Sequence, residues 1–270
     1  MRGQKKFKLE DLVLKNLAQQ EFVNIGPDEL CPCGSGKLFS QCCQSLRHRY
    51  AVAWENKDGS KACIDATLLS QRVLDLVGYM EKSRKGKMGI KEAFTCLSGF
   101  YLRYDRLVKV FAPLISCRRY CHWCCHYYAG ISLLEAEYIR RYAQENLPVK
   151  TRQIILEKIK LQAPHYIRSC QRPNNPRKDA KMMADYFSKR IPCPFLSDHD
   201  DCLIYPARPF TCRSHCAVSP PITCKTGKGL ELLDVMNLCD HLAGWLQDIS
   251  LGWLGNGDWE HIGLWFVDGL

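Results

Sequence analysis

The sequence predicts a mainly α-helical protein with irregular, cysteine-rich loops that bind metal. Apolar residues recur at helical spacing through most of the chain after residue 66, and no segment alternates in the sustained way expected of strands. The chain also carries 17 cysteines in 270 residues, most of them in tight groups. We expect an N-terminal part over residues 1–50, with a helix and a small zinc knuckle, and a helical domain over residues 60–270.

Each predicted helix follows from an apolar stripe or from a start or stop signal. Ser132 and Glu135 form a capping-box match that begins one helix, and Pro148 ends it. Leu69, Val73 and Met80 belong to the apolar stripe of the helix expected over residues 66–85. The expected helices cover residues 8–20, 66–85, 90–110, 132–147, 152–162, 178–189 and about 232–246.

Composition limits the function classes. Hydrophobic residues make up 46% and charged residues 24% of the chain, which are ordinary values for a globular protein. No run of 18 apolar residues occurs, so we expect no membrane span. The formal net charge of +10 permits contact with nucleic acid, but the basic residues are spread out and no base-reading motif accompanies them.

The cysteines form three groups whose spacing brings several thiolates to one point. Such soft donors suit zinc, copper(I) or an iron–sulfur cluster. A disulfide framework is the alternative, but it needs an oxidising compartment, and the N-terminal MRGQKKFKLEDL lacks the apolar core of a secretory signal. We therefore expect a cytoplasmic protein with reduced thiols. The predicted ligands are Cys31, Cys33, Cys42, Cys43, Cys117, Cys121, Cys124, Cys125, Cys193, Cys202, Cys212 and Cys216.

The first group lies in CPCGSGKLFSQCC, where four thiolates can complete a closed tetrahedral zinc site. Gly34 and Gly36 permit the sharp turn that the first cysteine pair demands. The segment resembles the SEC-C motif, with Leu38 where a second lysine is common. This resemblance implies a zinc module that docks on a protein partner, although a purely structural zinc remains open. The GSGK stretch is too short to be a phosphate-binding loop.

The second group lies in SCRRYCHWCC, and the third lies in CPFLSDHDDCLIYPARPFTCRSHC. Together, over residues 115–220, they resemble the YkgJ-like family of zinc- or iron-chelating cysteine clusters. This resemblance implies bound zinc or an iron–sulfur cluster. Eight thiolates exceed what one zinc or one cubane can use, so two metals are held or some thiols stay free. Cys224 is close enough in sequence to be a reserve ligand.

Arginines and histidines lie near these cysteines in the sequence and are candidates for tuning groups or ligands. Arginines near thiolates can offset charge and donate hydrogen bonds to sulfur, although solvated surface arginines remain an equal alternative. Enough thiols are present that the nearby histidines are expected not to bind metal. The arginines are Arg118, Arg119, Arg208 and Arg213, and the histidines are His122, His126 and His215.

The sequence therefore predicts a metal-binding protein with a binding or accessory role and no catalytic residues. The alternative is an iron–sulfur enzyme, because the YkgJ-like cysteine pattern also resembles part of the bacterial protein lysine N-methylases. Cys117, Cys121 and Cys124 show the C-x3-C-x2-C spacing of a cubane with an open iron, but no glycine-rich cofactor-binding turn accompanies it.

Overall fold

The computed structural model describes residues 21–55, 61–83, 87–118, 120–166, 176–233 and 238–270. Contacts group the chain into two compact units, which are described separately. Unit 1 comprises Met1–Ser83, Ser98–Ile115 and Val235–Leu238, and unit 2 comprises the remainder. The predicted division into residues 1–50 and 60–270 stays a prediction, and the helix predicted over residues 8–20 lies outside the described residues.

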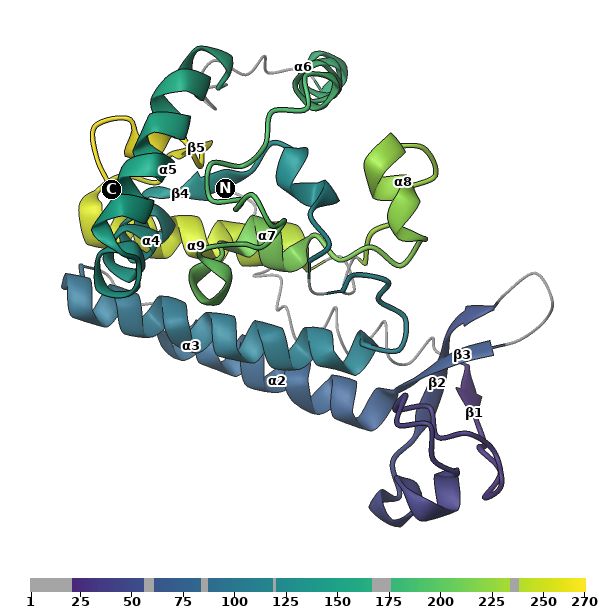
Figure 1. The fold of residues 1–270 in the computed structure, drawn as a ribbon. Helices are drawn as coiled ribbons and strands as arrows, with labels where there is room; N and C mark the ends of the chain where they lie inside the picture. The colour runs from purple at the N-terminus through teal and green to yellow at the C-terminus, as the bar shows by residue number, and fades with distance from the viewer. Residues whose placement is uncertain (1–20, 56–60, 84–86, 119, 167–175, 234–237) are drawn as a thin grey trace. The chain divides into compact units, whose positions relative to one another are not determined.

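Unit 1 contains an antiparallel sheet in the order β1-β2-β3, which the sequence analysis did not predict (Figure 1). The pairing of β2 with β3 has an irregularity between Val52 and Trp54. It interrupts the alternation of apolar and polar residues by which a strand is recognised in a sequence. The expected turn at residues 58–60 lies outside the described residues. The strands are β1 (Phe22–Val23), β2 (Tyr50–Glu55) and β3 (Lys61–Asp65).

Helix α2 (Ala66–Ser83) follows β3 directly and buries the predicted stripe, including Leu69, Val73 and Leu76. Helix α3 (Ile90–Val108) runs beside it in Figure 1.

Within unit 1, Arg103 connects these two helices. It pairs with Asp75 at 3.2 Å and places its guanidinium 4.0 Å from the centre of the Tyr79 ring. Gly99 permits this close approach, because a Cβ there would lie 2.2 Å from the Tyr79 hydroxyl. The two helices predicted over residues 66–85 and 90–110 are confirmed.

Unit 2 surrounds a second core that includes Ile131, Ile139, Ile155 and Phe195. The predicted capping box is confirmed, because the Ser132 hydroxyl accepts from the Glu135 amide while the Glu135 carboxylate accepts from the Ser132 amide. The elements are β4 (Gly130–Ser132), α4 (Leu133–Asn146), α5 (Val149–Gln162), α6 (Pro176–Ser188), α7 (Phe210–Ser214), α8 (Pro221–Thr226), α9 (Cys239–Leu254) and β5 (Trp259–His261), with β4 and β5 paired antiparallel.

The mainly α prediction is confirmed, with eight α-helices in the described part of the chain. Helix α9 begins at Cys239, later than predicted: Leu232 instead forms an isolated bridge with Ala217. None of the described helices combines the length and apolarity that a membrane crossing requires.

Candidate metal centres

The first cysteine group lies on a loop between β1 and β2 whose backbone closes on itself. The Cys31 amide donates to the Lys37 carbonyl at 2.8 Å, and Leu30 and Leu38 form an antiparallel bridge. Between them, Gly34 and Gly36 adopt φ of 77° and 72°, a left-handed conformation that favours glycine. The predicted knuckle is therefore formed as its glycines suggest.

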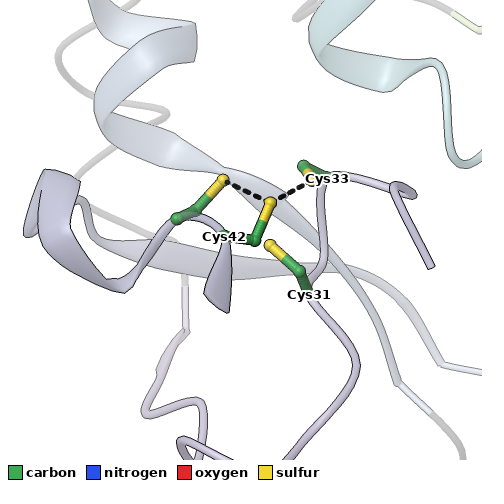
Figure 2. A group of neighbouring side chains, drawn as sticks. Cys31, Cys33 and Cys42 are labelled. Carbon is green, nitrogen blue, oxygen red and sulfur yellow. Dashed lines mark hydrogen bonds between the residues drawn. The ribbon is translucent and has the colours of Figure 1, made fainter. Parts of the chain in front are cut away.

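The four sulfur atoms of this loop converge. Those of Cys31, Cys33, Cys42 and Cys43 all lie within 4.8 Å of one another. Figure 2 shows Cys31, Cys33 and Cys42 around one point, with Cys33 Sγ 3.5 Å from Cys42 Sγ. Tetrahedral zinc with Zn–S bonds of about 2.3 Å requires sulfur separations of about 3.8 Å. The spacing therefore suits a single ion.

The electrostatics of these thiols also suit a metal. Burial raises the pKa of Cys33, but hydrogen bonds with Ser35, Cys31 and Cys42 outweigh it and bring the pKa to about 6. One thiolate is thus present at neutral pH. Burial, followed by hydrogen bonding with Cys31 and Cys42, raises the pKa of Cys43. Since protons and a cation compete for these sulfurs, metal binding here would release protons.

Tyr50, on β2, is a feature of this site that sequence reasoning missed. It is 3% exposed and packs edge-on against Phe39, with ring centres 5.4 Å apart. Its buried hydroxyl has no hydrogen-bond partner in the described structure, and Cys43 is among the groups that raise its pKa, after burial and the charge of Asp65. A metal-bound Cys43 thiolate would accept a hydrogen bond from this hydroxyl.

Comparison with protein families agrees with this geometry. Residues 29–45 match the SEC-C motif. We call the loop the SEC-C module from here on. No match was found among curated proteins or among solved structures. The SEC-C module therefore has a four-cysteine cluster that could hold a metal ion.

The second and third cysteine groups face one cavity inside unit 2. The cavity has a volume of about 700 Å³, and all eight predicted cysteines of these groups line it. Cys224, which was only a reserve ligand on sequence grounds, lines it as well. Aromatic residues such as Tyr128 and Tyr186 complete the wall. We call this space the cysteine cavity.

Backbone contacts bring these distant segments together. The Cys193 amide donates to the Cys125 carbonyl at 2.7 Å, and Leu196 forms an antiparallel bridge with Cys202. On another part of the wall, the Ala217 amide donates to Cys117 Sγ at 3.3 Å. In contrast to the SEC-C module, no three thiols of the cysteine cavity lie within 4.8 Å of one another, as judged over the described residues.

The thiols of the cysteine cavity differ in acidity. A hydrogen bond with Cys125 lowers the pKa of Cys124 to about 7, and the charge of Arg208 acts in the same direction. Burial raises the pKa of Cys193 to about 12 and that of Cys212 well above its usual value. None of the described cysteines forms a disulfide, so no disulfide competes for these sulfurs within the described chain.

The arginines near the thiols have different roles. Burial raises the pKa values of Cys202 and Cys212, and the charge of Arg208, which lines the cysteine cavity, offsets part of that increase. Arg213 is 4% exposed and donates to the carbonyl oxygens of Arg208 and Pro206. It therefore stabilises the backbone of the segment that precedes α7. Arg119 lies outside the described residues.

His215 lines the cysteine cavity, and its buried Nε2 has no hydrogen-bond partner in the described structure. Burial lowers its pKa, so the ring is neutral and offers a lone pair. His122 lies 3.4 Å from Asp200, and His126 has a buried Nδ1 without a described partner. The prediction that the three histidines are not ligands stays a prediction.

Proposed function

We propose that this protein is a metal-binding accessory protein that holds zinc in the SEC-C module and an iron–sulfur cluster or zinc in the cysteine cavity. The observation that carries the proposal is the convergence of four sulfurs of the SEC-C module within 4.8 Å. A ligand set made only of thiolates is typical of structural zinc. The Tyr50 hydroxyl would support that site from behind Cys43.

The cysteine cavity is the second metal site of the proposal. Its eight predicted cysteines belong to the region that resembles the YkgJ-like family, and they are more widely spaced than those of the SEC-C module. An iron–sulfur cluster places several irons and sulfides between its cysteines and therefore holds them farther apart than one ion does. The wide spacing favours a cluster over a single zinc, and Arg208 would offset part of its negative charge.

The proposed role is docking and assembly in the cytoplasm. The SEC-C module would dock a protein partner, in line with the role that the motif resemblance implies. Leu30 on this module is 70% exposed and Leu46 is 54% exposed, so apolar side chains are available for such a contact.

A second candidate function follows from the size and lining of the cysteine cavity. A volume of about 700 Å³ falls in the range of small-molecule sites, and aromatic residues share the wall with the thiols. This favours an iron–sulfur enzyme related to the bacterial protein lysine N-methylases as the alternative. Equilibrium dialysis with labelled S-adenosylmethionine tests it, and absence of binding to the metal-loaded protein would exclude that activity.

The main proposal is tested by anaerobic purification of the full chain followed by elemental analysis and visible absorption. We expect zinc together with a brown chromophore, and loss of the chromophore without loss of zinc in Cys193→Ser. A colourless protein with zinc at both places would assign zinc to the cysteine cavity. A protein whose metal content is unchanged in both Cys31→Ser and Cys193→Ser would refute the proposal.

A further inference from the structure

The cysteine cavity is lined by nine thiols, one more than the predicted eight. We propose that Cys224 is a metal ligand and that the cysteine cavity holds two separate metal centres. The first centre would use Cys125, Cys193, Cys202 and Cys212. The second would use Cys117, Cys121, Cys216 and Cys224. This inference rests on the proposed function of the cavity and deepens it.

The first set is joined by its own backbone. The 2.7 Å hydrogen bond from the Cys193 amide to the Cys125 carbonyl aligns those two residues. The bridge between Leu196 and Cys202 closes a tight turn that returns Cys202 toward Cys193. Cys193 in turn is among the groups that act electrostatically on the Cys212 thiol. Four thiols from three segments therefore line the same cavity.

The second set is anchored by different contacts. Ser116 donates through its amide to the Ala217 carbonyl at 2.9 Å, and the Ala217 amide donates back to Cys117 Sγ at 3.3 Å. These bonds hold Cys117 beside the segment that carries Cys216. Cys121 follows on the same loop, where its amide closes a turn on the Arg118 carbonyl.

Cys224 is brought to this second set by helix α8, which packs against the 3₁₀ helix at Trp123–His126. The Tyr127 hydroxyl donates to the Cys224 carbonyl at 3.0 Å, and Lys225 lies 4.9 Å from the centre of the Trp123 ring. Cys224 itself is 3% exposed.

Its thiol environment distinguishes Cys224 from an ordinary core cysteine. Burial raises its pKa, and the thiols that act on it electrostatically are those of Cys117, Cys121 and Cys124. Cys193, Cys202 and Cys212 are not among those groups. A buried thiol that shares a cavity wall with eight other thiols has the surroundings of a metal ligand.

Cys124 lies between the two sets. It is hydrogen bonded to Cys125 of the first set and acts electrostatically on Cys117 and Cys224 of the second. Nine thiols thus divide into two sets of four with Cys124 shared between them. This arrangement explains how one cavity uses more thiolates than a single zinc or cubane accepts.

The test counts metal per chain in the full-length protein by native mass spectrometry and elemental analysis. Cys224→Ser and Cys121→Ser should each lose the metal of the second centre and keep that of the first. Cys193→Ser should lose the metal of the first centre and keep that of the second. The double variant Cys121→Ser/Cys193→Ser should keep only the metal of the SEC-C module. Cys96→Ser is the matched control, because Cys96 is also buried, at 8% exposure, and lines neither site.

Two results would overturn the inference. One is an unchanged metal content in Cys224→Ser, and the other is loss of the same metal in Cys121→Ser and Cys193→Ser, which would mean one centre. If Cys224→Ser does not fold, the additivity of the Cys121→Ser and Cys193→Ser losses still decides between one centre and two. Failure of the proposed function is distinguishable, since then the wild-type protein would carry metal in the SEC-C module alone.

Discussion

The backbone amide of Phe210 donates to Oε1 of the buried Glu135 carboxylate at 2.7 Å. The other oxygen of that carboxylate accepts from both the amide and the hydroxyl of Ser132. One side chain therefore holds the first turn of α4 and the start of α7, the helix that carries Cys212. Glu135 is thus a positioning residue for the cysteine cavity.

Replacing Glu135 by alanine should lower the free energy of unfolding by about 2–4 kcal/mol, because two buried backbone amides lose their acceptor. Urea unfolding measures this change. The variant should also hold less metal in the cysteine cavity while the SEC-C module keeps its own. Glu145→Gln is the control on the same helix, since its surface ion pair with Arg141 is exposed and should contribute less than about 1 kcal/mol. Equal losses in the two variants would contradict the positioning role.

The SEC-C module should lose its metal independently of the cysteine cavity. Cys31→Ser or Cys42→Ser removes one of four converging thiols and should reduce the metal content by one ion per chain. The near-complete burial of Cys31, at 4% exposure, means that its replacement should also loosen the local packing with Phe39 and Tyr50. Elemental analysis and limited proteolysis measure the two effects. Release of iron or loss of colour in these variants would argue against independent sites.

The hydroxyl of Tyr50 should strengthen metal binding in the SEC-C module. Tyr50→Phe keeps the ring that packs on Phe39 but removes the donor beside Cys43. Because groups behind metal ligands typically contribute 10–100-fold to metal affinity, we expect zinc to bind about 10-fold more weakly. Competition with a chromophoric chelator gives the affinity. Tyr79→Phe, on α2, is a matched control that should leave zinc affinity unchanged.

Local signals predicted most of the helices and the SEC-C module. The apolar stripe of α2 and the capping box of α4 each depend on residues that are close together in the sequence. The spacing from Cys31 to Cys43 likewise places four thiols on one short loop. These features depend on contacts within a few turns of chain. Short-range physics therefore suffices to predict them.

Long-range features could not be predicted in the same way. The pairing of β2 with β3 is obscured by the irregularity at Val52, and Tyr50 reaches Cys43 only because the sheet places β2 behind the loop. Arg213 carries the same charge as Arg208, yet only the fold decides that it braces a loop. Likewise, the packing of α8 against the Trp123–His126 turn brings Cys224 to the cavity. No local pattern encodes these approaches.

The buried imidazole of His261 should make the stability of unit 2 fall in acid. Its Nε2 lies 2.8 Å from the Tyr186 hydroxyl, and its Nδ1 accepts from the Gly263 amide at 3.1 Å. Because Nδ1 is an acceptor, the ring is neutral, with its proton on Nε2. Burial lowers its pKa from the ordinary value of 6.5 to about 3. Between these two values the unfolded chain binds a proton that the folded protein does not.

The contribution of His261 to the free energy of unfolding is therefore fully present above about pH 6.5 and falls as the pH drops toward 3, by about 1.4 kcal/mol per pH unit. His261→Gln removes this titration, so the stability advantage of wild type over the variant should shrink by about 2 kcal/mol between pH 7 and pH 5. Urea unfolding at both pH values measures it, and thiol protonation affects both proteins alike. Tyr186→Phe keeps the imidazole and should follow the wild-type pH slope. Parallel curves for wild type and His261→Gln would mean that the imidazole titrates normally in the folded protein.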